Sequence, residues 1–185
     1  MTSSARFRFA PMTRPDAEMI LAWRYAPPYA VYNAVADQPD GVDALGEMLD
    51  KRSPYFAARL LDGAAWEQEP PAGFFAFGSA CEVGSEPEAP EEPHLARADG
   101  SITIGLGLRP DLTGRGFGAP FTLAGLTLAR DQFQPTGFRL FVYAWNLRAI
   151  TAYERAGFVA RGRAGRVGVD GLPAFLQMWR AVPSM

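Results

Sequence analysis

The sequence predicts a mixed α/β (α+β) fold with a central sheet of about six to seven strands flanked by helices. Segments with the period-2 alternation of strands interchange along the chain with segments of helical period. The chain has 185 residues, enough to bury a sizeable core, and we expect a single domain over residues 1–185. Its 48% hydrophobic and 21% charged content is ordinary for a globular protein.

The N-terminal half predicts a strand, two short helices and an antiparallel meander. Large apolar and basic residues alternate before Thr13, which stands before Pro15 and a helical run as an N-cap would. Pro27 and Pro28 interrupt the aromatic segment that follows. In chain order we expect a strand at 6–13, a helix after Thr13, a turn or short helix at 25–35, a short helix at 43–51, and strands at 55–63 and 72–83.

Residues 82–99 predict an acidic, proline-rich loop. Five glutamates and three prolines lie between Glu82 and Pro93. Such a composition cannot build a core, and it is typical of solvated, mobile segments.

The C-terminal half predicts strand, helix, strand, helix and a terminal hairpin. Gly105 and Gly107 interrupt the first of these strands and indicate either a bulge or the close approach of another group. In chain order we expect a strand at 101–110, a helix at 117–132, a strand at 137–144, a helix at 147–158 that ends at Gly157, and hairpin strands at 158–167 and 173–182 around a tight turn at Asp170-Gly171.

Charge and composition exclude several classes of protein. A formal net charge of −2 gives no reason to expect nucleic acid as a partner, since that usually needs a basic face. The single Cys81 rules out an internal disulfide framework and fits a reducing compartment. No run resembles a signal peptide or reaches the length of a membrane span. We therefore expect a cytoplasmic protein without a membrane partner and without a metal site.

Three glycines, Gly114, Gly116 and Gly118, stand immediately before the helix expected at 117–132. The first amides of a helix lack partners and carry partial positive charge, so bare glycines there let a phosphate group approach them. A glycine-rich turn that merely lets strand and helix pack closely remains the alternative. A Walker site is excluded because Lys51 is the chain's only lysine. Gly114, Gly116 and Ala119 also match the G-x-G-x-x-A pattern of a dinucleotide-binding fold. That fold needs an acidic residue at the end of the next strand to bind ribose, and no carboxylate stands there.

Two stretches resemble the motifs of the GNAT superfamily of acyl-CoA-dependent N-acyltransferases. "TGRGFG" at 113–118 is similar to the superfamily's Arg/Gln-x-x-Gly-x-Gly/Ala loop, with Thr113 where arginine or glutamine usually stands. "VYAWNLRAITAYERAGF" at 142–158 is similar to the second motif, in which an asparagine precedes a helix that carries a tyrosine. Asn146 and Tyr153 are the counterparts, about two helical turns apart. The two motifs cover roughly residues 101–160.

The resemblance implies a GNAT-like, mostly antiparallel sheet in which the strands at 101–108 and 137–144 splay apart to form the acyl-CoA cleft. It further implies acetyl-CoA as the acyl donor, with its diphosphate on the glycine loop and its pantetheine arm along the first splayed strand, which Gly105 and Gly107 would let it approach. The implied donor-binding residues are Leu106, Leu108, Thr113, Gly114, Arg115, Gly116, Phe117, Gly118, Ala119, Asn146 and Tyr153.

The implied chemistry is acetyl transfer to an amine. The main-chain N–H of Leu108, or of a neighbour, would stabilise the oxyanion, and Tyr153, with a reference pKa of about 10, would protonate the departing thiolate. A core-packing role is the alternative for Tyr153. No general base is identified: Glu82 is the best-placed acid but is expected to be a solvated loop residue, and His94 is expected to be an exposed bystander. An amine that arrives partly deprotonated through ordered water would need no dedicated base.

Aromatic residues predict the acceptor side of the site. Trp23, Tyr25, Tyr29 and Tyr32 gather in "AWRYAPPYAVY", and Trp145 stands beside the second motif. Core packing would account for one or two of them, and the others would wall a pocket for a flat or cationic amine. The expected acceptor is a primary amine of a small molecule or peptide. A protein N-terminus or lysine and a non-catalytic acyl-CoA sensing module are the alternatives, and a homodimer is left open.

Overall fold

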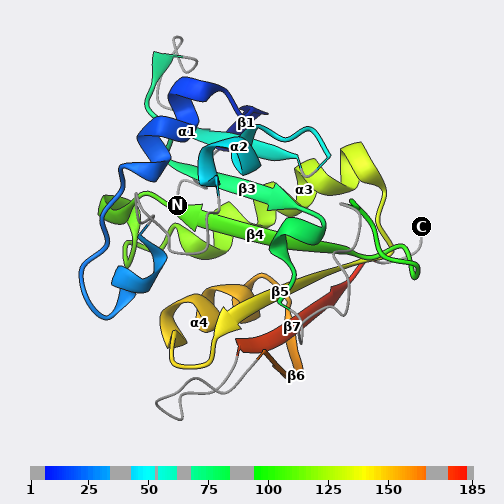
Figure 1. Cartoon of the computed structure of the whole chain (residues 1–185). Coiled ribbons are helices and arrows are strands. Elements are labelled where there is room, and N and C mark those ends of the chain that lie inside the picture. Colours follow the sequence, from blue (N-terminus) through cyan, green and yellow to red (C-terminus); the bar gives the residue numbers. More distant parts are fainter. Residues whose placement is uncertain are drawn as a thin grey trace.

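The computed structural model describes residues 7–33, 43–52, 54–61, 68–83, 94–165 and 175–182. Within them the strands form one mixed sheet in the order β1-β2-β3-β4-β5-β7-β6 (Figure 1). All neighbouring strands are antiparallel except β4 and β5, which are parallel. The strands are β1 (Phe7–Pro11), β2 (Tyr55–Leu60), β3 (Gly73–Phe77), β4 (Ile102–Leu108), β5 (Gly137–Tyr143), β6 (Val159–Ala164) and β7 (Phe175–Ala181).

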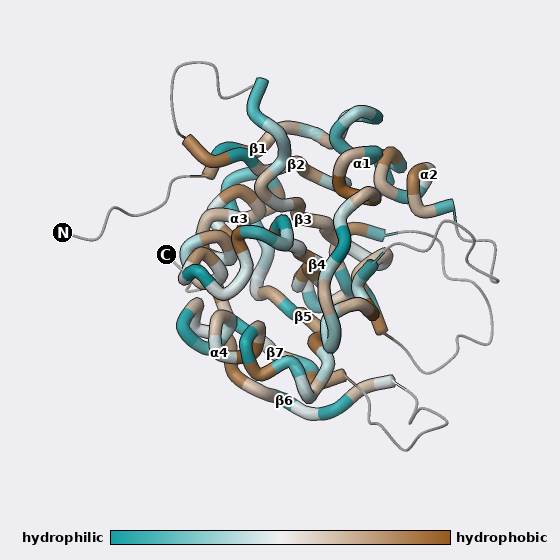
Figure 2. Tube along the Cα trace, turned by 90° about the vertical axis from the view of Figure 1, so that its left-hand side faces the viewer, coloured by the Kyte–Doolittle hydropathy of each residue, from teal (hydrophilic) through white to brown (hydrophobic). Residues whose placement is uncertain are grey.

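The helices cover both faces of this sheet: α3 and α4 lie on one side, α1 and α2 on the other (Figure 2). The α-helices are α1 (Arg14–Leu21), α2 (Ala44–Leu49), α3 (Gly118–Phe133) and α4 (Leu147–Arg155), and the 3-10 helices are η1 (Tyr29–Tyr32), η3 (Ser79–Cys81) and η4 (Pro110–Leu112). The predicted mixed, mostly antiparallel sheet flanked by helices is therefore confirmed.

Alternate residues of β3 build the two cores. Phe75 faces α3, where its ring lies 4.9 Å from that of Phe121, and it fills the space above Gly125. Phe74 faces the other way and contacts the rings of Trp23 and Tyr55 at 6.3 and 6.2 Å. This alternation is what a strand buried on both faces requires, and it fixes α3 and α1 on opposite sides of the sheet.

Local signals place the helix ends where the sequence predicts them. The Thr13 side chain accepts a hydrogen bond from the N–H of Asp16 and caps α1. Gly157 follows α4 with a φ of +87°, the left-handed conformation that glycine adopts most easily. Both predictions are confirmed.

One strand prediction is corrected, and at Gly105 and Gly107 the structure decides between a bulge and the close approach of another group. The strand expected at 72–83 ends at Phe77, because the chain turns at Gly78 with a φ of +95° and enters η3. Gly105 and Gly107 form no bulge, since β3 and β4 pair in continuous register. A Cβ on Gly107 would overlap the ring of Phe74, and one on Gly105 would lie 3.1 Å from the sulfur of Cys81. These glycines therefore make room for side chains of the protein itself, above one face of the sheet.

The parallel strands β4 and β5 separate along their length, as the resemblance to the GNAT superfamily implies. They pair only through Ile102 with Phe138 and Thr103 with Arg139. Beyond those pairs β4 stays with β3 while β5 stays with β7, so the two strands diverge toward their carboxyl ends (Figure 1).

Several predictions concern residues that lie wholly or partly outside the described ranges. Most of the acidic loop, at 84–93, and the Asp170-Gly171 turn lie outside the described residues. The hairpin formed by β6 and β7 is present. Among the described helices, none is both long and apolar enough to cross a bilayer.

Candidate functional site

A cavity of about 760 Å³ opens where β4 and β5 diverge. Its walls include Ile104 to Leu108 of β4 and Leu140 to Val142 of β5. Residues of α1, α2, α3 and α4 complete it, so the cavity runs from one helical layer to the other through the gap in the sheet. The volume lies in the range of small-molecule pockets.

The glycine loop forms one end of this cavity. None of the N–H groups from Gly114 to Ala119 makes a hydrogen bond to another described residue, and the first bond into α3 is donated by Phe121 to the carbonyl of Phe117. The N-cap residue of α3, Phe117, provides no side-chain hydrogen bond to these amides. Successive amides at the positive end of a helix are suited to an anion.

The three glycines contribute in different ways. Gly114 and Gly116 have φ values of +75° and +86°, and a Cβ on either would meet no atom within 4 Å. Their backbone is therefore open to a ligand. A Cβ on Gly118 would lie 2.8 Å from the Cβ of Ala152, so this glycine also lets α3 pack closely on α4. Close packing thus applies at Gly118, while an anion site at Gly114 and Gly116 stays a prediction.

The side chains around the loop face other ways. The Thr113 hydroxyl donates to the carbonyl of Pro110 at 2.7 Å. Arg115 is exposed and does not line the cavity, whereas Thr113, Gly114, Gly116, Gly118 and Ala119 do. The ring of Phe117 contacts that of Phe7 at 6.4 Å. The loop therefore offers mainly main-chain groups to the cavity.

The main chain of β4 faces the gap at alternate residues. Arg109 donates its N–H to Ala72 on the β3 side at 2.9 Å. Because successive residues of a strand direct their N–H and C=O groups to opposite sides, Leu108 and Leu106 direct theirs into the gap. The Leu108 carbonyl accepts a hydrogen bond from the Tyr25 hydroxyl at 2.7 Å.

Tyr153 projects from α4 into the cavity. Its ring packs against Phe158 at 6.2 Å, and its hydroxyl makes no hydrogen bond to a described residue. Burial, with smaller effects of Tyr32 and Tyr25, raises the pKa of Tyr153 well above its usual range. The group is therefore a protonated phenol at any physiological pH.

Asn146 joins the second motif to the aromatic segment. It is 5% exposed, its side-chain oxygen accepts from the N–H of Ala149 at 3.1 Å and caps α4, and its amide donates to the Tyr32 hydroxyl at 2.9 Å. Burial raises the pKa of Tyr32, although the bond from Asn146 acts in the opposite direction. Both residues line the cavity.

Four of the five predicted acceptor-side aromatics come together. Tyr32 lies 6.4 Å from Tyr25 and 6.3 Å from Trp145, and Trp145 lies 5.7 Å from Tyr29. Burial raises the pKa of Tyr25 to about 12. Trp23 is separate: it packs on Phe74, although it still lines the cavity.

Sequence reasoning missed three residues. Tyr143 stacks on Trp145 at 5.5 Å, and the Arg148 guanidinium lies 3.9 Å from the centre of the Tyr29 ring. Both stand inside the quoted second motif and could have been named. Glu47 of α2 lines the cavity from the opposite layer. Nothing in its sequence context marked it.

The expectation for Glu82 and His94 is corrected. Glu82 is only 22% exposed and binds Arg97 and, at 3.0 Å, the Thr103 hydroxyl. His94 lies 3.8 Å from the same carboxylate and is partly buried. Partial burial acts to raise the pKa of Glu82, but the hydrogen bonds from Arg97 and Thr103 leave it lowered. Both residues belong to a polar cluster at the first residues of β4, and neither lines the cavity.

Within the described residues, no three His, Cys, Asp or Glu side chains cluster as metal ligands would.

Comparison with known proteins gives partial sequence relatives and full-length structural ones. No family model matches the chain. A mycothiol acetyltransferase of Streptomyces scabiei is 40% identical over 90 residues, 48% of this chain and 28% of the relative. One of Streptomyces coelicolor is 46% identical over 66 residues, 36% of this chain and 21% of the relative. The chain thus matches less than a third of the length of these curated relatives.

Among solved structures, a chimera of spermidine N-acetyltransferase SpeG from Vibrio cholerae and hSSAT has a TM-score of 0.65 at 15% identity over 95% of both chains. Aminoglycoside acetyltransferase AAC(6')-Ib in complex with coenzyme A has a TM-score of 0.63 at 20% identity, again over 95% of both chains. At these identities the likeness establishes the fold. The resemblance to the GNAT superfamily is confirmed at that level: the chain has the GNAT fold.

Proposed function

We propose that this chain is an acetyl-CoA-dependent N-acetyltransferase that acetylates a primary amine. The observation that carries the proposal is the row of N–H groups from Gly114 to Ala119, which have no partner among the described residues and open on the cavity between β4 and β5. The names of the sequence relatives and structural neighbours, all acetyltransferases, support the same reaction.

The residues present fit acetyl-CoA as the acyl donor. The amides of 114–119 would hold the diphosphate, because a Cβ on Gly114 or Gly116 would point into open space and the backbone is reachable there. The N–H and C=O groups of Leu106, directed into the gap, would bind the pantetheine arm in place of a β5 partner. Several neighbours are structures with coenzyme A or acetyl-CoA bound, which supports this donor.

Two groups of the chain would act on the reacting atoms. Acetyl-CoA supplies the acetyl group as an activated thioester. The N–H of Leu108, further along β4, would donate to the oxygen on which negative charge develops. Tyr153 would donate its proton to the thiolate that leaves, and its raised pKa keeps it protonated until then. The hydrogen bond from Asn146 to Tyr32 would keep the acceptor side next to α4.

The acceptor is proposed to be a small molecule. A cavity of about 760 Å³ lined by Tyr25 and Tyr32 suits a compact amine with apolar or flat parts. The relatives are named for mycothiol, spermidine and aminoglycoside acetylation, and each name describes that protein. A homodimer and a cytoplasmic location remain predictions for this chain, to be measured by light scattering and by cell fractionation.

Release of coenzyme A thiol tests the function. The chain would be assayed with acetyl-CoA and a panel of phenethylamine, spermidine, ribostamycin and a peptide with a free N-terminus, with calorimetry of coenzyme A binding in parallel. Amine-dependent thiol release together with an acetylated product in mass spectrometry supports the proposal. Saturable coenzyme A binding without release on any amine would instead support a non-catalytic sensing module. Preferential turnover of the peptide would favour the protein acetyltransferase alternative.

A further inference from the structure

Glu47 is the only carboxylate among the described residues that line the cavity. It lies on α2, whose first turn is fixed by a hydrogen bond from the N–H of Gly46 to the Asp43 side chain at 2.9 Å. Its Oε1 accepts a hydrogen bond from the Tyr55 hydroxyl at 2.7 Å. Its other oxygen makes no hydrogen bond to a described residue, and no described arginine or lysine forms an ion pair with it.

The contacts of this carboxylate place it over the middle of β4. The Tyr55 ring stacks on Phe74 at 6.2 Å, and Phe74 covers Gly107 of β4. Burial raises the pKa of the Cys81 thiol, and the negative charge of Glu47 adds to that effect. The sulfur of Cys81 lies against Gly105 of β4. Glu47 therefore stands beside the splayed strand on the α1 and α2 side, across the sheet from the glycine loop.

We propose that Glu47 binds the ammonium group of the acceptor and accepts its proton. This inference rests on the proposed acetyl transfer and supplies the base that the sequence did not identify. A primary amine has a pKa of about 10, so most of it is an ammonium ion at neutral pH and has no lone pair to react. A carboxylate that lines the cavity and is held by one oxygen both attracts that cation and can take a proton from it.

The protons balance through two groups of the chain. One N–H bond of the ammonium breaks and an O–H bond forms on Glu47, which returns that proton to water. The nitrogen lone pair then forms the C–N bond to the acetyl carbon, and the C–S bond breaks with its electron pair on sulfur. Tyr153 gives its proton to the sulfur and recovers one from the newly bonded nitrogen. The third proton stays on the amide product.

Charge in the cavity indicates that the acceptor carries a single ammonium group. Arg148 lies over the Tyr29 ring at 3.9 Å, and its positive charge acts on Tyr25 and Tyr32. A second ammonium group at this aromatic end would be repelled by the guanidinium, whereas a neutral or anionic group would not be repelled. A carboxylate on one side and a guanidinium at the aromatic end therefore favour a monoamine over a polycation.

Tyr55 acts as a positioning residue. Burial raises the pKa of Tyr55 far above its usual range, with Cys81 and the hydrogen bond to Glu47 adding to it, so the phenol keeps its proton and donates. Among the described residues, the titratable group that acts on both members of this pair is Cys81, at the end of η3.

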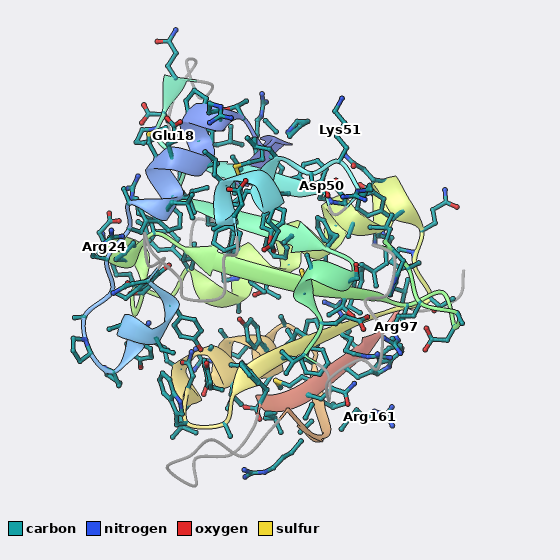
Figure 3. All side chains as sticks on the ribbon, viewed as in Figure 1. Glu18, Arg24, Asp50, Lys51, Arg97 and Arg161 are labelled. Atoms are coloured by element: carbon teal, nitrogen blue, oxygen red, sulfur yellow. The ribbon has the colours of Figure 1, made fainter. Side chains whose placement is uncertain are left out.

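The test compares Glu47→Gln with Glu18→Gln. Glu18 is a 57% exposed carboxylate of α1, away from the cavity at the rim of the molecule (Figure 3). With phenethylamine at pH 7, E47Q is expected to lose about 100-fold in kcat/KM, while coenzyme A affinity stays unchanged and E18Q behaves as wild type. The loss of kcat/KM in E47Q should shrink as the pH rises toward the pKa of the free amine, because more of the amine then arrives neutral. A defect that is absent, or equal at every pH, overturns the proposal.

Two further measurements extend the test. Tyr55→Phe is expected to raise KM for phenethylamine with little change in kcat or in coenzyme A affinity, because the carboxylate that binds the ammonium group loses the hydroxyl that holds it in place; an unchanged KM, or a loss confined to kcat, would overturn the positioning role. Phenethylamine should be turned over at least tenfold more efficiently than spermidine, measured as kcat/KM, and the reverse order overturns the single-charge acceptor.

The proposed acetyl transfer and the proposed ammonium site at Glu47 can be refuted separately. If the wild type binds coenzyme A but releases no thiol, the proposed function fails. Calorimetric titration of the coenzyme A complex with phenethylamine and with the uncharged phenethyl alcohol then decides the ammonium site. Binding of the amine that E47Q abolishes supports it, whereas no amine binding, or equal binding by both proteins, overturns it.

Discussion

Replacing Gly116 with alanine separates backbone strain from ligand binding at the glycine loop. Gly116 has a φ of +86°, and a Cβ there would meet no protein atom within 4 Å. The free energy of unfolding should therefore fall by only about 1–2 kcal/mol, which is the cost of placing an L-residue in the left-handed region. For a chain of this size that corresponds to a fall in Tm of about 2–8 °C.

The effect on coenzyme A should be larger than the strain alone. The new methyl group would occupy the space through which a diphosphate reaches the amides, and loss of one charge-assisted hydrogen bond costs about 1.5–3 kcal/mol. This corresponds to an increase of about 10- to 150-fold in Kd. Isothermal titration with coenzyme A measures it directly, and urea unfolding gives the free energy of unfolding.

Gly162→Ala is the matched control. Gly162 also has open space around its Cβ position, but it lies in the edge strand β6 with an ordinary φ. Its substitution should leave Kd unchanged and alter stability by no more than about 1 kcal/mol. If G116A loses the expected stability yet binds coenzyme A as tightly as the wild type does, the loop does not hold the diphosphate and the proposed donor site is wrong.

Three further predictions concern other parts of the chain. Tyr153→Phe should lower kcat about 100-fold or more with coenzyme A affinity nearly intact, measured by thiol release; unchanged kcat would remove the phenol from the reaction. Asp16→Ala leaves the 9% exposed Arg59 side chain without its 2.6 Å ion pair. The free energy of unfolding in urea should fall by about 3–5 kcal/mol, and a fall of less than about 1 kcal/mol would contradict a stabilising buried pair. The folded pKa of Glu82 is lowered, so its stabilising contribution is present above its ordinary pKa of 4.5 and is lost as the pH falls through the lowered value. Glu82→Gln should flatten the acid side of the Tm–pH curve, and an unchanged slope there would show that the contacts with Arg97 do not stabilise the fold.

The order of elements and most of their ends followed from the sequence because they depend on neighbours in the chain. The Thr13 cap and the positive φ of Gly157 are set within a few residues. The same holds for the open backbone at Gly114 and Gly116. Where a strand end depended on a distant segment, the prediction was wrong: β3 stops at Gly78 because the chain at residues 94–95 packs there.

The sequence by itself determined the glycine loop at a helix start and the Asn146–Tyr153 helix beside it, since both are local patterns. Only the tertiary structure decided which side chains meet around the gap: Tyr25 bonds the carbonyl of Leu108, Asn146 bonds Tyr32, and Glu47 bonds Tyr55 at the wall of the same cavity. The first two of those contacts join residues that are far apart in the chain. They exist because β4 stays with β3 while β5 follows β7, which opens the sheet and lets both helical layers reach one cavity.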